Sequence, residues 1–176
     1  MLVRYIILAF LLTAAVFQDM RSYKVRNITA ASGAAAGLLV NLILDGPKGL
    51  LLSIIAAFIP FILLIALFAL KMLGAGDIKL FCAVGAIMGV RFILIAMVIS
   101  FLSGGIIAIF LMLIRSNSLQ RLRHLAEYLK TCFFTQSFHT YTDFNNKNDG
   151  SKFHFSIAIA SGCIITALYC VTGTGV

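Results

Sequence analysis

Long apolar runs separated by short polar segments dominate the pattern along this chain of 176 residues. A helix needs about 20 mostly apolar residues to cross the hydrocarbon core of a bilayer. We therefore predict an all-α integral membrane protein, a bundle of about six transmembrane helices in a single domain, 1–176. The predicted spans are 2–17, 28–44, 49–70, 78–90, 92–114 and 153–172.

The fourth and fifth spans come from one uninterrupted apolar run, 78–114, in which Arg91 is the only charged residue. As one helix this run would be about 55 Å long, whereas the hydrocarbon core is about 30 Å thick. We therefore divide it at Arg91 into a short span and a longer one. For the first run, 2–17, a secretory signal peptide is the alternative, but Thr13-Ala14-Ala15 is a poor cleavage site and further spans follow, which favours a retained helix.

Small residues mark where helices should approach closely. Gly33 and Gly37 form a G-x-x-x-G pair in the second run, and Gly85 and Gly89 form another in the fourth. Between helices in lipid, small residues allow close backbone contact. Both runs are therefore expected to pack inside the bundle.

The long polar segment 115–152 is expected to form a cytoplasmic loop with an amphipathic surface helix. Its apolar residues recur at helical spacing and basic residues lie between them, which is typical of a helix on a membrane surface. The apolar residues are Leu119, Leu122, Leu125, Leu129, Cys132 and Phe133, and the basic ones are Arg121, Arg123 and Lys130.

Composition supports a membrane protein. Hydrophobic residues make up 61% of the chain and charged residues 11%, whereas a soluble domain is about half apolar and roughly a quarter charged. The net charge of +8 does not indicate a nucleic-acid partner, because no basic motif is interleaved with exposed aromatic residues. The cysteines and histidines lack zinc-ligand spacing, so no metal or other cofactor is expected.

Two of the six acidic residues, Asp19 and Asp77, lie at the edges of apolar runs. A charge at such a place is costly, which makes it a candidate functional group. Asp19, in a predicted polar turn over 18–27, follows one predicted crossing. Asp77, at the end of a predicted glycine loop over 71–77, follows three. One and three are both odd numbers of crossings, so we expect the two acids on the same side of the membrane.

Basic residues indicate which side that is. The side with both acids holds eleven of the 14 Lys and Arg residues, and cytoplasmic loops carry such an excess. We therefore expect both acids to face the cytoplasm and both termini to lie outside. The eleven residues are Arg21, Lys24, Arg26, Lys71, Lys79, Arg115, Arg121, Arg123, Lys130, Lys147 and Lys152.

Two nearby carboxyl groups suit aspartic-protease chemistry. They cannot both ionise cheaply, so the pair can hold one proton; the ionised acid then activates water while the protonated acid donates to the peptide carbonyl. Gly74 and Gly76 would permit φ > 0 and close approach of an extended substrate. The alternatives are that Asp77 is a helix N-cap, that Asp19 is a surface charge facing Arg21, and that Lys79 is a boundary lysine.

Two motifs resemble the type IV prepilin peptidases, membrane aspartic proteases of the GxGD class. Gly74-Ala75-Gly76-Asp77-Ile78-Lys79 resembles their G-x-G-D-x-K signature, and the segment 18–27 resembles D-x-R-x-x-x-I-P-N except at Val25 and Arg26. The start of the last run, 152–162, resembles the start of their last helix. The resemblance implies that Asp19 and Asp77 are the catalytic dyad, that Gly74 and Gly76 shape the substrate loop, and that Lys79 matches the motif lysine, with no assigned role.

The resemblance also implies the function. The family removes the short basic leader of prepilins and pseudopilins at the cytoplasmic face of the bacterial inner membrane, so the expected partners are a precursor protein and the lipid bilayer. The chain lacks the insert with two C-x-x-C pairs of larger members, which implies a small Flp/Tad-type peptidase without N-methyltransferase activity. The alternatives are an archaeal preflagellin peptidase, a proton-coupled carrier with acids near the bilayer midplane, and a non-catalytic pilus-assembly scaffold.

Overall fold

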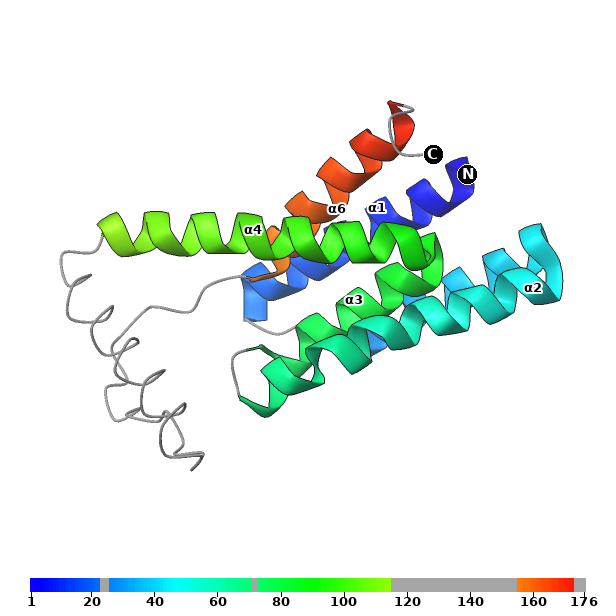
Figure 1. Ribbon diagram of the computed structural model, residues 1–176, viewed down its shortest axis with the longest axis horizontal. Helices are drawn as coiled ribbons and strands as arrows, with labels where there is room; N and C mark the ends of the chain where they lie inside the picture. The colour runs from blue at the N-terminus through cyan, green and yellow to red at the C-terminus, as the bar shows by residue number, and fades with distance from the viewer. Residues whose placement is uncertain (23–25, 71–72, 115–154, 173–176) are drawn as a thin grey trace. The chain divides into compact units, whose positions relative to one another are not determined.

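A computed structural model describes residues 1–22, 26–70, 73–114 and 155–172, and the regular structure in these residues is entirely helical (Figure 1). This confirms the predicted helical class for the part of the chain described. The predicted surface helix and the loop 115–152 lie outside it. The helices are α1 (Leu2–Ser22), α2 (Asn27–Ala69), α3 (Ala75–Met88), α4 (Val90–Ile114) and α6 (Phe155–Val171).

Among the described residues, three helical stretches are long and apolar enough to cross a membrane: Leu2–Arg21, Asn27–Ala69 and Val90–Phe110. Helix α6 is apolar but shorter. The count of six spans stays a prediction. The chain divides into two compact units, 1–104 with 154–176, and 105–153. In the first unit, α1, α2, α3, α6 and the first part of α4 bury a shared apolar core, to which α2 contributes Leu64. The contacts that shape the candidate site lie in this unit.

Helix α2 consists of two arms that fold back on each other at Gly46, whose φ of 68° and ψ of −158° interrupt the helical backbone. The Nδ2 of Asn41 donates to the Oγ of Ser53 over 2.9 Å. In a straight helix, residues this far apart in sequence would be separated by about 18 Å. The predicted spans 28–44 and 49–70 correspond to these two arms, and the reversal is visible along α2 in Figure 1.

Two predicted boundaries near the acids are wrong. Helix α1 continues to Ser22, so Asp19 lies in a helix and not in a polar turn. Neither Gly nor Pro follows Phe17 within this stretch, and polar residues alone do not end a helix. Helix α3 begins at Ala75, which places Asp77 in its first turn and not in a loop.

The predicted division of 78–114 is confirmed, but it falls at Gly89 and not at Arg91. Gly89 has a φ of 89°, in the left-handed region that glycine adopts without steric cost, and α4 begins at the next residue. The expected packing role of Gly89 is also wrong, since a Cβ there would meet nothing within 4 Å. Its function in the fold is to end α3.

The other three glycines of the two predicted pairs do lie at close helix contacts. A Cβ on Gly33 would stand 2.6 Å from a methyl carbon of Leu11 in α1. A Cβ on Gly37 would stand 2.8 Å from the backbone carbon of Ala86, and one on Gly85 would stand 2.2 Å from the carbonyl oxygen of Ala56. Both arms of α2 therefore touch α3 backbone to backbone.

The carbonyl groups in the last turn of α3 are hydrogen-bonded by polar side chains from α2. The Nδ2 of Asn41 donates to the carbonyl oxygens of Ala86 at 2.8 Å and Ile87 at 3.3 Å, and Ser53 also donates to Ala86. At 14 residues, α3 is about 21 Å long, less than the hydrocarbon thickness of about 30 Å. Asn41 and Ser53 therefore provide hydrogen-bond donors for these carbonyl groups, which water cannot do inside the hydrocarbon core.

Replacing Asn41 with Leu should destabilise the protein by about 1–3 kcal/mol, because the carbonyl oxygen of Ile87 loses its side-chain donor and that of Ala86 loses one of its two. Thermal unfolding of the purified protein in detergent would measure this. Thr13→Ala is the matched control, since Thr13 is exposed and donates only within α1, to Ala9. An Asn41→Leu protein as stable as the control would contradict the prediction.

Three aromatic rings fix the start of α6 against α3 and α4. The ring centroids of Phe81, Phe101 and Phe155 lie between 5.8 and 6.5 Å from one another. Such distances are typical of favourable aromatic packing. The residue that follows Phe155, Ser156, is thereby held at a defined place in the bundle.

Candidate active site

Asp19 lies in the last turn of α1 and is buried, with 8% of its surface exposed. A buried carboxyl group needs hydrogen-bond partners. The Oγ of Ser156, in the first turn of α6, donates to the Oδ2 of Asp19 over 2.6 Å. The interpretation of Asp19 as a surface charge is therefore wrong.

Asp77 lies in the first turn of α3, and Gly74 is the N-cap residue of that helix. The alternative that Asp77 itself caps the helix is therefore wrong. The backbone N–H of Asp77 donates to the carbonyl oxygen of Gly74 over 3.1 Å. A carboxyl group in the first helical turn also interacts favourably with the helix dipole.

Gly74 and Gly76 do not have the positive φ that the sequence suggested. Gly74 has a φ of −74° and Gly76 lies within α3, while the positive-φ glycines among the described residues are Gly46 and Gly89. The structure gives Gly74 a different role. A Cβ there would stand 3.0 Å from the Oδ2 of Asp77, so glycine leaves room for that carboxyl group.

The two acids share one electrostatic environment. The pKa of Asp77 is raised from 3.8 to about 6, chiefly by burial and next by the negative charge of Asp19, while a backbone hydrogen bond from Gly74 partly opposes both. Asp77 precedes the predicted span 78–90. Because the charge of Asp19 acts on Asp77, the last turn of α1 and the first turn of α3 bring the two carboxyl groups to the same end of the bundle.

This raised pKa should make the protein less stable as pH rises. The folded protein holds the Asp77 proton to a higher pH than the unfolded chain, so the stabilisation is complete below about pH 4 and is lost as pH rises through about 6. The free energy of unfolding should therefore fall by up to about 3 kcal/mol over this pH range in the unmodified protein. This fall should be absent in Asp77→Asn, because asparagine cannot titrate. Unfolding midpoints measured in detergent at several pH values would test this. The prediction would be contradicted if the midpoint of Asp77→Asn changed with pH as much as that of the unmodified protein.

Hydrogen bonds between the helix ends connect the two motifs. The Nζ of Lys79, an exposed residue of α3, donates to the Oδ1 of Asn27 at the start of α2 over 2.9 Å. The Oε1 of Gln18 in α1 accepts from the backbone N–H of Arg26 at 3.1 Å and from the hydroxyl of Thr29 at 2.9 Å. Lys79 therefore joins α3 to α2 at the edge of the site.

Sequence reasoning missed Ser156 and gave no role to Gln18 or Asn27. For Ser156 a signal was present in the sequence. The last predicted span follows five crossings, an odd number, so its start is expected on the same side as Asp19 and Asp77. A polar residue at that place was a candidate partner for either acid. The sequence assigned it no role beyond its place in the stretch 152–162, which resembles the start of the family's last helix.

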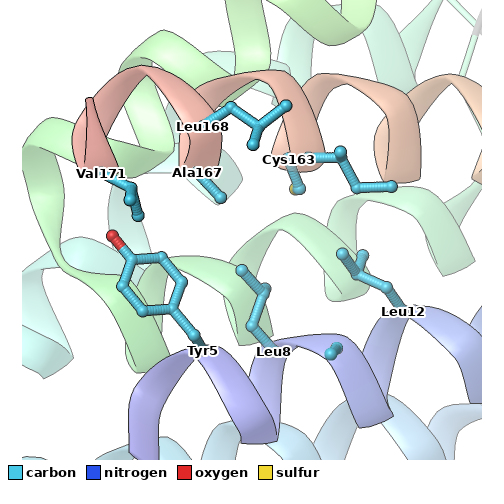
Figure 2. Close-up of a pocket in the computed structure, with 9 residues that line it drawn as sticks. Tyr5, Leu8, Leu12, Cys163, Ala167, Leu168 and Val171 are labelled. Carbon is cyan, nitrogen blue, oxygen red and sulfur yellow. The ribbon is translucent and has the colours of Figure 1, made fainter. Parts of the chain in front are cut away.

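An apolar pocket of about 190 Å³ lies between α1 and α6, away from the acids (Figure 2). Its lining residues nearest to the site, Leu12 and Cys163, are about two helical turns from Asp19 and Ser156 respectively. Neither aspartate lines it. The lining residues are Tyr5, Leu8, Ala9, Leu12, Cys163, Ile164, Ala167, Leu168 and Val171.

Fold and site together define a helical membrane protein with two interacting carboxyl groups at one end of its bundle. The profile of the type IV leader peptidase family matches residues 6–109, which include both acids and both motifs. The chain belongs to this family, so it is a prepilin-type leader peptidase with a protein substrate. No curated protein and no solved structure matches the chain.

Proposed function

We propose that this protein is an aspartyl endopeptidase that removes the short basic leader from prepilin or pseudopilin precursors. The observation that carries the proposal is the interaction of the half-buried Asp77 with the buried Asp19, within the region that matches the leader peptidase family. A pair of carboxyl groups that holds one proton can hydrolyse a peptide bond without a metal or a covalent intermediate.

In the proposed mechanism the two acids take different roles. Asp77 holds the shared proton, in keeping with its raised pKa, and Asp19 acts as the base. Asp19 takes a proton from water as the water oxygen bonds to the scissile carbonyl carbon, and Asp77 donates its proton to the carbonyl oxygen. When the tetrahedral intermediate collapses, Asp19 returns its proton to the leaving amine and the carboxylic product releases a proton to Asp77.

The N-terminal end of α3 is suited to an extended substrate. Gly74 and Ala75 are exposed, and Gly74 has no side chain that would crowd the Asp77 carboxyl group. We assign Gly74 and Gly76 to shaping the path of the substrate backbone. Lys79 is assigned to the same edge of the site, where its bond to Asn27 keeps the first turns of α2 and α3 together.

The proposed site faces the cytoplasm at the inner membrane. This orientation is supported by the excess of Lys and Arg on the side that the two acids share. A precursor with a basic leader and a following hydrophobic helix would place its leader on that side and keep its helix in the bilayer. The lack of an insert with two C-x-x-C pairs supports a small peptidase of the Flp/Tad type, and an archaeal preflagellin peptidase would use the same chemistry.

Reconstitution into liposomes with a leader-bearing precursor would test the function. Mass spectrometry should show two products, a free basic leader and a shortened protein that begins at or near its hydrophobic segment. An intact precursor after prolonged incubation with the folded protein would overturn the proposal. Cleavage within the mature protein would overturn the assigned substrate site.

A further inference from the structure

We propose that Ser156 is a positioning residue that holds the Asp19 carboxyl group in the orientation required for activating water. The inference rests on the proposed two-aspartate function. It follows from one contact, the 2.6 Å hydrogen bond from the Ser156 hydroxyl to the Oδ2 of Asp19. Ser156 is fully buried and Asp19 nearly so, so bulk water does not compete freely for this bond.

Helix α6, which carries Ser156, is packed against α3 and α4. Its neighbour Phe155 belongs to the aromatic group with Phe81 and Phe101. Further along α6, a Cβ on Gly162 would lie 2.7 Å from the backbone nitrogen of Ser100, so α6 and α4 are in close contact. A donor fixed in this way can orient its acceptor without rearrangement during the reaction.

The hydrogen bond is made to one defined oxygen of Asp19. A hydroxyl has one proton to donate, and here it is directed at Oδ2. Anchoring at Oδ2 therefore limits rotation of the Asp19 carboxyl group. The raised pKa of Asp77 agrees with a pair in which the proton resides on Asp77 and Asp19 acts as the base.

Ser156 belongs to neither sequence motif. The family match ends at residue 109, before α6 begins. The site is thus completed by a helix that lies far along the chain from both acids, and the support for Asp19 comes from a residue of this chain that the family match does not cover.

Steady-state kinetics of leader cleavage would test the proposal. Ser156→Ala and Ser156→Gly should each lower kcat by about tenfold or more, the loss expected for a hydrogen bond to a charged group, with KM unchanged. Ser156→Thr keeps the hydroxyl and should restore most of kcat. Thermal unfolding of every variant in detergent would show that the proteins compared are folded.

Ser161→Ala is the matched control. It removes a hydroxyl from the same helix, where the Oγ of Ser161 lies within hydrogen-bond distance of the carbonyl oxygen of Ala158, at 2.9 Å, and of the Oγ of Ser103, at 3.1 Å. Its kcat should equal that of the unmodified protein. An equal loss in Ser161→Ala, or a folded Ser156→Thr protein no better than Ser156→Ala, would overturn the positioning role.

The Asp19→Asn protein separates failure of this inference from failure of the proposed function. If Asp19→Asn is inactive while Ser156→Ala and Ser156→Gly keep full kcat, the positioning role alone is wrong. If Asp19→Asn cleaves the precursor normally, the two-aspartate function is wrong, and the role of Ser156 falls with it. If Asp19→Asn is inactive and the Ser156 variants lose kcat as described, both are supported.

Discussion

Exchange of either Asp19 or Asp77 for Asn is expected to lower kcat/KM for leader cleavage by about a thousandfold, the middle of the range for loss of a general acid or base. Asparagine keeps the size of the side chain but cannot exchange a proton with water or with the scissile peptide. Initial rates with a reconstituted precursor would measure the effect. Both variants are expected to fold, because neither change adds volume.

The double variant provides the sharper test. Since the two acids are proposed to act as one unit, Asp19→Asn combined with Asp77→Asn should lose no more activity than either single change. Losses that multiply would indicate two independent roles and contradict a dyad. Asp149→Asn, an acid outside both motifs, is the control and should leave the rate unchanged.

The pattern of apolar runs predicted the helical class of the described residues, and the number of crossings predicted one end for both acids, in agreement with the effect of the Asp19 charge on Asp77. The side assigned to each acid depends only on whether the number of preceding crossings is odd or even, so errors in helix boundaries do not change it. Those errors were real: α1 continues past Asp19, and α3 starts before Asp77. Polar residues at the end of a span are compatible with both helix and loop. Which of the two forms depends on contacts with residues distant in sequence, such as that of Asp19 with Ser156.

Glycine positions could be read from the sequence, but their roles could not. Gly46 and Gly89 have a positive φ and reverse the chain, whereas Gly74, expected to do so, has an ordinary φ. The difference depends on which groups lie near each backbone. The same holds for Asn41, whose bonds to the end of α3 join residues that are distant in sequence.

Gly85→Ala is expected to cause the largest loss of stability among single-methyl additions at the α2–α3 contact. The new Cβ would stand 2.2 Å from the carbonyl oxygen and 2.9 Å from the carbonyl carbon of Ala56. Both are backbone atoms, so an arm of α2 would have to move to relieve the clash. Overpacking of this kind costs about 1–3 kcal/mol and occasionally more, which exceeds the gain of about 1 kcal/mol from replacing glycine in a helix.

Gly105→Ala separates these opposing effects. A Cβ at Gly105, a helical residue of α4, would meet nothing within 4 Å, so only the gain in helix propensity remains. In thermal unfolding in detergent, the midpoint should fall for Gly85→Ala and stay level or rise for Gly105→Ala. Because α3 also carries Asp77, folded Gly85→Ala protein should cleave the precursor more slowly as well. An unchanged midpoint with full activity would show that the α2–α3 contact is not what positions the acid.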